Sequence, residues 1–511
     1  MSTRRTIQQR TAHASVAGLV STAASIVLQI ATVPFVLTFW GAERYGLWLA
    51  VMAVVMTVRS IEGGYITFVG NQFNVLYHES RDRLQRTLGA SIAMCAGLGA
   101  VQILVSAALL ASGSDSILWG AGKGHLDGDN AGVALIVLVV AWALAGNFPA
   151  LLNRLLVPAG MLSHAIWWSL AYQATLFAVV MLAAWLGASI QRAAAAYAAA
   201  QALIYLTSAG YIRRKLPEFY PWWHGGRLST GLQDLSRSIV LTVNSGVQQA
   251  GVSGALLVVS SFLGPAMVAA FGTARTLANF GTALGGVFAN ALAPELVRYF
   301  VTAQHEKLLL AFRATALSSG LAVNVSLLAL IACAEPVYAI WTNGRLSLDL
   351  PVFLGLAAAV SAWSAGWPFC NFLAVINSLR AQLMLTLIRT GAALGVGVAY
   401  VDAFGLAAVA LGIGLGELAA SLLASFVIVP RLIASREGHV PRLVQAEGLF
   451  LSLPVLGICL YGMFAGDLPG ALTLAAAAVV LLLGWRAWRR LPQDARERAA
   501  SIIRRKQLEQ S

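Results

Sequence analysis

Residues 16–69 read VAGLVSTAASIVLQIATVPFVLTFW, then GAERY, then GLWLAVMAVVMTVRSIEGGYITFV, which makes two long apolar runs joined by a short polar turn. Each run is long enough to cross the ~30 Å hydrocarbon core of a membrane as a helix. Hydrophobic residues make up 59% of the 511 residues and charged residues 11%, against about 25% charged in a soluble domain. Continuous runs of this length are not the alternating strands of a membrane barrel. The sequence therefore predicts an all-α polytopic membrane protein.

Apolar windows of this kind recur along the whole chain, and we expect 14 transmembrane helices. They lie near residues 16–40, 46–69, 87–111, 132–155, 164–187, 193–212, 237–262, 265–292, 313–334, 351–376, 381–401, 404–429, 447–465 and 469–486. The first ten residues are polar and basic, and a full-length span follows them. We therefore expect the first span to be retained and not cleaved as a signal peptide.

The distribution of positive charge predicts the orientation. With the N-terminus placed in the cytoplasm, cytoplasmic segments hold 27 of the 34 Lys and Arg, external loops hold 4 and the spans hold 3. Lys and Arg gather on the cytoplasmic side of membrane proteins. We therefore expect both termini in the cytoplasm and the chain in the bacterial inner membrane. The net charge of +13 then reflects topology, and no nucleic-acid partner is predicted.

The chain is expected to divide into two six-helix lobes. Residues 1–212 would form the N-lobe, 213–236 a cytoplasmic linker, 237–429 the C-lobe, 430–486 helices 13 and 14, and 487–511 a basic cytoplasmic tail. Two halves that both begin inside are parallel repeats, related by a pseudo-two-fold axis along the membrane normal.

Arg59 and Arg275 lie deep inside apolar spans. A charge at the membrane centre costs at least ~2.5–3.5 kcal/mol, so it normally faces a water-filled cavity, a partner or a substrate. Superposing Gly41 on Gly264, the first turn of each lobe, puts the two arginines two helical turns apart on corresponding helix faces. Glu62 follows Arg59 by one turn and offers an ion pair as the alternative. For Arg275 the alternative is snorkelling or a bond to a backbone carbonyl.

Other polar residues inside spans are candidates for a cavity or for coupling. Arg389 lies near its helix end, where reaching the cytoplasmic interface is the favoured interpretation. Glu417 follows the glycines of residues 412–416, whose spacing permits close helix contact; it is a candidate proton carrier or arginine partner. Asn244 and Gln248 are spaced i,i+4 on the seventh span, which suits a hydrated lumen or a helix–helix contact.

Several chemistries are excluded by the sequence. It contains no nucleotide-binding loop, no zinc-ligand spacing and no nucleophile triad, so we predict no catalytic residues, no metal and no cofactor. An H⁺ or Na⁺ gradient is left open as the energy source. The four cysteines, Cys95, Cys333, Cys370 and Cys459, lie in or beside spans and are expected to be packing residues.

The chain resembles the polysaccharide and lipid-linked oligosaccharide flippases (Wzx-type, O-antigen flippases) of the multidrug/oligosaccharidyl-lipid/polysaccharide (MOP) exporter superfamily. The turn Phe39–Trp48, the stretch Glu62–Gly64 and the basic segment His78–Arg86 carry this resemblance. It implies two lobes around a central cavity that opens to one side at a time. An undecaprenyl-pyrophosphate-linked glycan would pass from the inner to the outer leaflet for surface or exopolysaccharide biosynthesis. The resemblance places the pyrophosphate on Arg59 and Arg275, whose planar guanidinium groups suit phosphate oxygens.

The implied partners are the glycan lipid, the lipid bilayer, and a polysaccharide polymerase with other proteins of the same pathway. Alternatives are a lipid II flippase and a cation-coupled exporter of amphipathic small molecules. Relatives that export drugs tend to have an acidic residue in the first helix, whereas Val16–Trp40 has none; Glu62 or Glu417 would then couple to the cation. A membrane glycan polymerase or ligase is disfavoured by external loops of only about 20 residues or fewer.

Overall fold

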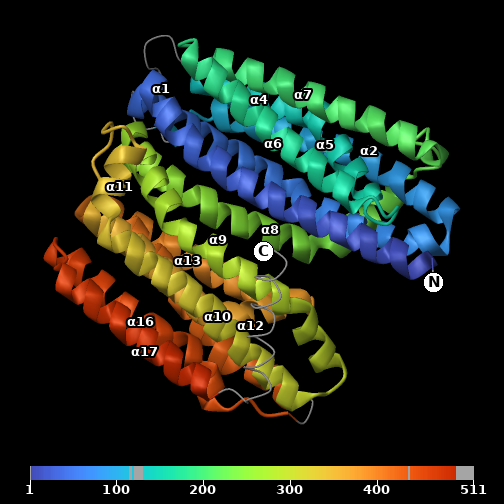
Figure 1. The fold of residues 1–511 in the computed structure, drawn as a ribbon. Helices are drawn as coiled ribbons and strands as arrows, with labels where there is room; N and C mark the ends of the chain where they lie inside the picture. Colours follow the sequence, from blue (N-terminus) through green and yellow to red (C-terminus); the bar gives the residue numbers. More distant parts are fainter. Residues whose placement is uncertain (1, 114–117, 120–129, 436–437, 491–511) are drawn as a thin grey trace. The chain divides into compact units, whose positions relative to one another are not determined.

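The structure is a computed structural model that describes residues 2–113, 118–119, 130–435 and 438–490. These residues form helices joined by short turns and contain no strand (Figure 1). The all-α fold that the sequence predicts is therefore confirmed. All but the first four residues of the predicted basic tail, 487–511, lie outside the described residues.

Eleven helices among the described residues are long and apolar enough to cross a membrane. The first of them, α1 (Ser2–Glu79), covers both of the first two predicted spans. Two more predicted spans correspond to α7 (Ile190–Lys215) and α9 (Pro265–Val301), which are not among the eleven. The polytopic architecture is thus confirmed, while the number of fourteen spans stays a prediction.

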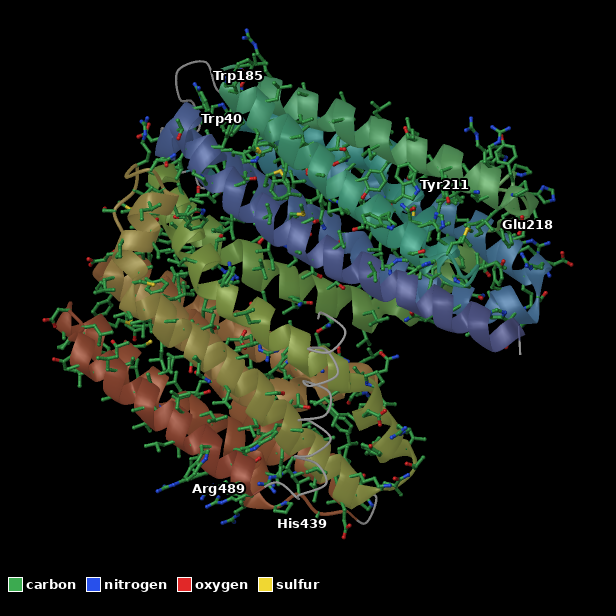
Figure 2. All side chains as sticks on the ribbon, in the orientation of Figure 1. Trp40, Trp185, Tyr211, Glu218, His439 and Arg489 are labelled. Atoms are coloured by element: carbon green, nitrogen blue, oxygen red, sulfur yellow. The ribbon has the colours of Figure 1, made fainter. Side chains whose placement is uncertain are left out.

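The first compact unit comprises Met1–Gly272 and Ala339–Ser347. Within it α1 packs against both α6 and α8, and α7 packs against α4 and α6. Its further helices are α2 (Arg81–Ala111), α4 (Ala131–Ala141), α5 (Asn147–Asn153), α6 (Leu162–Trp185) and α8 (Leu228–Leu263). Figure 2 shows Trp40 and Trp185 at one end of this unit and Glu218, in the predicted cytoplasmic linker, at the other.

The two predicted turns share one unusual backbone conformation. Gly41 has φ 72° and ψ 178° and bends α1 sharply, so that the rings of Trp40 and Trp48 lie 5.9 Å apart. Gly264, between α8 and α9, has φ 88° and ψ 171°. This region of backbone space is essentially restricted to glycine. The sequence-based match of Gly41 with Gly264 therefore has a counterpart in backbone geometry.

Helices α1 and α8 touch backbone to backbone. A Cβ atom on Gly64 would overlap the main chain of α8 at Thr242, and one on Gly46 would overlap the carbonyl of Pro265, where α9 begins. Glycine is needed at such points because no side chain fits between the helices. This packing places α8 in the first compact unit although the repeat assigns it to the C-lobe. The lobes are defined by the sequence repeat, whereas the compact units are defined by which helices pack together. The lobe boundaries therefore stay a prediction.

The predicted linker is shorter than expected and folds against the first unit. Helix α7 continues to Lys215, and α8 begins at Leu228. Between them Trp222 is buried at 8% exposure in an apolar cluster with Phe219, while Trp223 is 60% exposed. The Trp222 ring thus anchors the linker to the first unit.

The second unit comprises Thr273–Tyr338 and Leu348–Ser511. In it α12 packs against α10, α14 and α16, and α13 packs against α14. Its helices are most of α9, then α10 (His305–Ala332), α11 (Ala334–Trp341, in part), α12 (Leu350–Val375), α13 (Leu379–Phe404), α14 (Leu406–Leu423), α15 (Val429–Ala434), α16 (Arg442–Ala465) and α17 (Gly470–Arg489). All four cysteines of the chain are free.

Candidate functional site

Arg59 and Glu62 are joined through a third side chain. The Arg59 guanidinium carbon lies 3.4 Å from the centroid of the Trp142 ring. The Trp142 Nε1–H donates a hydrogen bond to Glu62 Oε1, and Gln102 Nε2 donates to Glu62 Oε2 at 2.9 Å. Among the described residues, no ion pair or hydrogen bond joins Arg59 directly to Glu62. The sequence left open a direct i,i+3 pair, but the structure couples the two charges through an indole.

This arrangement stabilises both charges in an apolar interior. Glu62 is only 2% exposed, and hydrogen bonds to an ionised group contribute roughly 1.5–3 kcal/mol each. A cation over an indole face contributes about 2 kcal/mol when desolvated. The carboxylate on the ring N–H also pushes electron density into the ring, which strengthens the attraction for Arg59. The three side chains therefore act as one unit.

A local distortion of the helix aims Trp142 at this position. Residues Trp142–Gly146 form a π-helical turn between α4 and α5, in which the Asn147 N–H bonds the Trp142 carbonyl. Pro149 cannot donate a bond back to Ala145, which favours an irregular turn there. A Cβ atom on Gly146 would overlap the indole. The ring therefore occupies the space that the glycine leaves.

Tyrosines complete the surroundings of Arg59. Tyr205 contacts Trp142 edge-on with ring centroids 5.5 Å apart, and Tyr172 lies 4.6 Å from Tyr205. Both are electrostatic neighbours of Arg59, as is Tyr197. Sequence reasoning missed this aromatic wall and Gln102. One sequence signal near Trp142 was available: the residues Gly-Asn-Phe-Pro at 146–149 interrupt an otherwise apolar span.

In the second unit, Arg389 and Glu417 form an ion pair. Arg389 Nε lies 2.8 Å from Glu417 Oε2, and its Nη2 donates to Cys370 Sγ at 3.3 Å. We expected Arg389 to reach the cytoplasmic interface; it turns inward instead because an acid is available on the adjacent helix. Of the readings left open for Glu417, the structure shows the arginine partner. A proton-carrying role stays a prediction.

The glycines before Glu417 bring the two helices together. A Cβ atom on Gly412 would lie 2.9 Å from the carbonyl oxygens of Ala392 and Ala393, and one on Gly416 would lie 2.7 Å from the Arg389 carbonyl oxygen. The small-residue spacing thus permits close helix contact, as the sequence predicts. That contact places Glu417 within reach of Arg389.

Arg275 also interacts electrostatically with Glu417. It lies on α9, is partly buried, and has no acid within one turn of its own helix. Its acidic neighbour comes from α14, far along the chain. Two arginines are therefore electrostatic neighbours of one carboxylate, and the three groups together carry one net positive charge.

Asn244 and Gln248 do not share one environment. Thr242 on α8 meets Gly64 of α1, and a Cβ on Gly63 would lie 3.9 Å from Ser245. Asn244 thus lies in the stretch of α8 that packs beside Glu62, and its Oδ1 is buried without a hydrogen-bond partner among the described residues. Gln248 is exposed. The hydrated lumen that we expected around them stays a prediction.

Comparison with solved structures identifies the fold. The lipid II flippase MurJ in an inward closed conformation superposes with a TM-score of 0.61 and 12% identity, covering 97% of this chain and 99% of that chain. An inward-facing multidrug resistance MATE transporter of the MOP superfamily gives 0.59 and 16%, covering 81% and 96%. The MATE multidrug transporter DinF-BH gives 0.56 and 13%, covering 82% and 93%.

No protein-family model matches the chain, and no curated protein matches it in sequence. The chain therefore shares its fold with MATE transporters and MurJ. With its apolar helices, the chain is a multi-pass membrane protein. Among the described residues, no group of three or more His, Cys, Asp or Glu is placed to hold a metal ion.

Proposed function

We propose that the chain is a flippase, not an enzyme, that moves a polyprenyl-pyrophosphate-linked oligosaccharide from the inner to the outer leaflet of the bacterial inner membrane. Alternating access between the two lobes would carry the substrate for surface or exopolysaccharide biosynthesis. The fold supports a transporter. The observation that carries the substrate class is the position of Arg59, a partly buried cation seated on an indole and not neutralised by a direct ion pair.

The stacking geometry suits recognition of a phosphate group. Trp142 takes one face of the Arg59 guanidinium, whereas the five N–H donors of that group point outward along its edge. Among the described residues no acceptor bonds those donors. A pyrophosphate offers paired oxygens that such an edge binds in a bidentate manner. Glu62, held by two neutral donors, contributes attraction to Arg59 without occupying its edge.

Arg275 is proposed as the second phosphate-binding residue. Two arginines, Arg275 and Arg389, have the carboxylate of Glu417 as an electrostatic neighbour. Arg389 is committed to that carboxylate by a 2.8 Å contact. The excess positive charge of this cluster would compensate the second phosphate of the substrate.

A cation-coupled exporter of amphipathic molecules is the second candidate. Glu62 favours it, because a fully buried carboxylate held by neutral donors is suited to binding a proton or Na⁺. The two functions differ in which residue is essential. The exporter requires Glu62 or Glu417 and tolerates Arg59→Ala. The flippase requires Arg59 and Arg275. A lipid II flippase shares the arginine requirement but would be essential for growth.

The test measures lipid-linked glycan on each leaflet in cells that lack the protein and receive a variant. Arg59→Ala and Arg275→Ala should each abolish outer-leaflet delivery. The control is Arg192→Ala, which removes an exposed arginine and should leave delivery unchanged. Normal delivery by the double variant Arg59→Ala/Arg275→Ala would refute the proposed mechanism.

A further inference from the structure

A cavity of about 580 Å³ opens where α1 ends and where α2 and α8 begin. Three arginines line it: Arg83 and Arg86 from the first two turns of α2, and Arg237 from α8. Thr87 and Thr230 add hydroxyl groups to the same wall. All of these elements belong to the first compact unit. The cavity lies in the segment that was predicted to be basic and cytoplasmic, and the proposed transport cycle does not use it.

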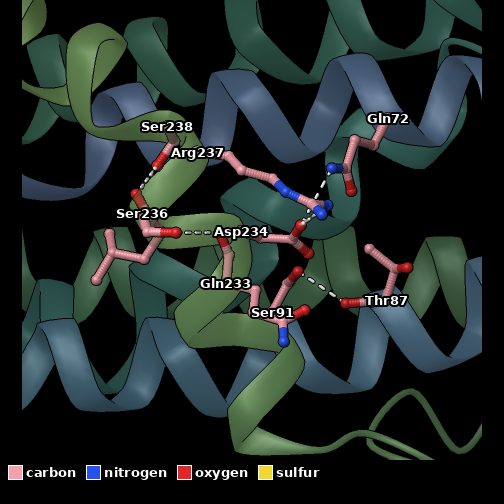
Figure 3. A network of polar contacts seen from close by, with 9 residues as sticks. Gln72, Thr87, Ser91, Gln233, Asp234, Ser236, Arg237 and Ser238 are labelled. Carbon is pink, nitrogen blue, oxygen red and sulfur yellow. Dashed lines mark hydrogen bonds and ion pairs between the residues drawn. The ribbon is translucent and has the colours of Figure 1, made fainter.

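A buried carboxylate organises one side of the cavity (Figure 3). Asp234 is 3% exposed, accepts a hydrogen bond from Gln72 Nε2 at 3.2 Å, and lies 3.7 Å from Nη1 of Arg237. It therefore ties α1 to α8 and holds one edge of the Arg237 guanidinium group. A buried acid that is shared in this way positions an arginine but does not saturate its five donors.

The other two arginines are held loosely. Arg83 lies 3.6 Å from Glu79 in an exposed pair, and Arg86 Nε donates to the Asp82 carbonyl at 3.3 Å. Exposed ion pairs contribute only about 0–1 kcal/mol, so an incoming anion can replace them. The lining holds three arginines against the two acids Glu79 and Asp234. Its net charge is therefore positive.

One helix end, the N-terminus of α8, adds to this field. Helix α8 is 36 residues long and begins at Leu228, no side chain caps its N-terminus, and Thr230 of its first turn lines the cavity. The N-terminus of a long helix carries a partial positive charge and offers backbone N–H groups to anions. Two apolar residues, Val75 and Leu76, complete the wall. The cavity therefore combines anion-binding groups with a lipid-compatible edge.

We propose that this cavity binds the phosphate diester of an anionic phospholipid headgroup. Basic pockets between transmembrane helices on the cytoplasmic side suit such headgroups. The arginines would hold the phosphate oxygens, Thr87 and Thr230 would donate hydrogen bonds, and Val75 would contact the glycerol region. The ligand joins α1, α2 and α8 at the end where Asp234 already links two of them. This inference goes beyond the proposed flippase function and does not depend on its substrate.

The experiment titrates the purified full-length protein in a neutral detergent with dioleoylphosphatidylglycerol and follows binding by native mass spectrometry. Dioleoylphosphatidylcholine and inorganic phosphate serve as the comparison ligands. Arg83→Gln and Arg86→Gln should each weaken phosphatidylglycerol binding roughly fivefold, the effect of one interfacial arginine. Glu79→Gln should tighten it, because it removes a competitor for Arg83. The control Arg214→Gln removes an exposed arginine at the end of α7 and should have no effect.

A variant that misfolds is recognised by a lowered melting temperature in phosphatidylcholine. Glu79→Gln is expected to tighten phosphatidylglycerol binding, and misfolding would not produce tighter binding. Equal weakening by Arg214→Gln would overturn the proposal, because the effect would then be general surface charge. Binding of inorganic phosphate as tight as that of the lipid, with the same dependence on the variants, would overturn the lipid source. Loss of glycan delivery by Arg59→Ala tests the proposed flippase separately and leaves this site unaffected.

Discussion

Replacing Trp142 with phenylalanine separates the two contacts of the indole. Phenylalanine keeps an aromatic face for Arg59 but removes the N–H that Glu62 Oε1 accepts. The lost hydrogen bond to a charged acceptor contributes roughly 1.5–3 kcal/mol, and Gln102 still supplies one donor to the carboxylate. The weaker cation–π contact of a phenyl ring adds up to about 1 kcal/mol. We therefore expect Trp142→Phe to lower the free energy of unfolding by roughly 2–4 kcal/mol.

Unfolding of the purified protein by SDS measures this change, and a double-mutant cycle with Glu62→Gln isolates the coupling. The single variants should interact by at least ~1 kcal/mol, because residues in one hydrogen-bond network are not additive. Trp167→Phe, an exposed tryptophan on α6, is the matched control and should change little. Delivery of glycan by Trp142→Phe should fall toward that of Arg59→Ala. The reasoning would be refuted if the effects of Trp142→Phe and Glu62→Gln on the free energy of unfolding were additive within about 0.3 kcal/mol and Trp142→Phe delivered glycan normally to the outer leaflet.

Three further substitutions probe the same structure. Gly146→Ala places a methyl group where the indole lies; we expect it to reduce stability and glycan delivery together, and unchanged delivery would contradict the role of the π-helical turn. Gly64→Ala forces α1 away from the α8 backbone and should lower the free energy of unfolding by about 1–3 kcal/mol. The control Gly97→Ala adds a methyl group with nothing within 4 Å and should be neutral or stabilising in the same SDS titration. Arg389→Leu should destabilise less than Glu417→Leu, because a second arginine still faces the carboxylate after the first change; thermal melting in detergent shows which order holds.

The sequence predicted the features that depend on composition and local pattern. Apolar run length predicted the helical membrane fold. Turns were predicted at Gly41 and Gly264, and the structure shows that they share one backbone conformation. Small-residue spacing before Glu417 predicted a close helix contact, which the glycine geometry confirms. Each of these follows from residues close together in the chain, where period and conformational preference are direct evidence.

Features that depend on distant residues were not predictable in this way. Glu62 accepts hydrogen bonds from side chains 40 and 80 residues away. The π-helical turn at Trp142–Gly146 breaks the 3.6-residue period of the helix, so this period does not predict which way the Trp142 side chain points. The ion pair of Arg389 was not predicted from its own helix because the acid, Glu417, lies on another one. Single-sequence periodicity shows which face is apolar but does not show which helix covers it.

The contacts of α1 with α8 and with the start of α9 bear on how a lipid tail would leave the protein in the proposed flippase. At Gly64 the main chain of α1 meets that of α8, and at Gly46 it meets Pro265, the first residue of α9, with no side chain between them, so this side of α1 is closed at two levels. A prenyl chain is several ångströms wide and needs a lateral slot if it is to stay in the bilayer while its sugar crosses. In this conformation the slot is not the α1–α8 seam. Sideways release along this line requires the glycine contacts to part first.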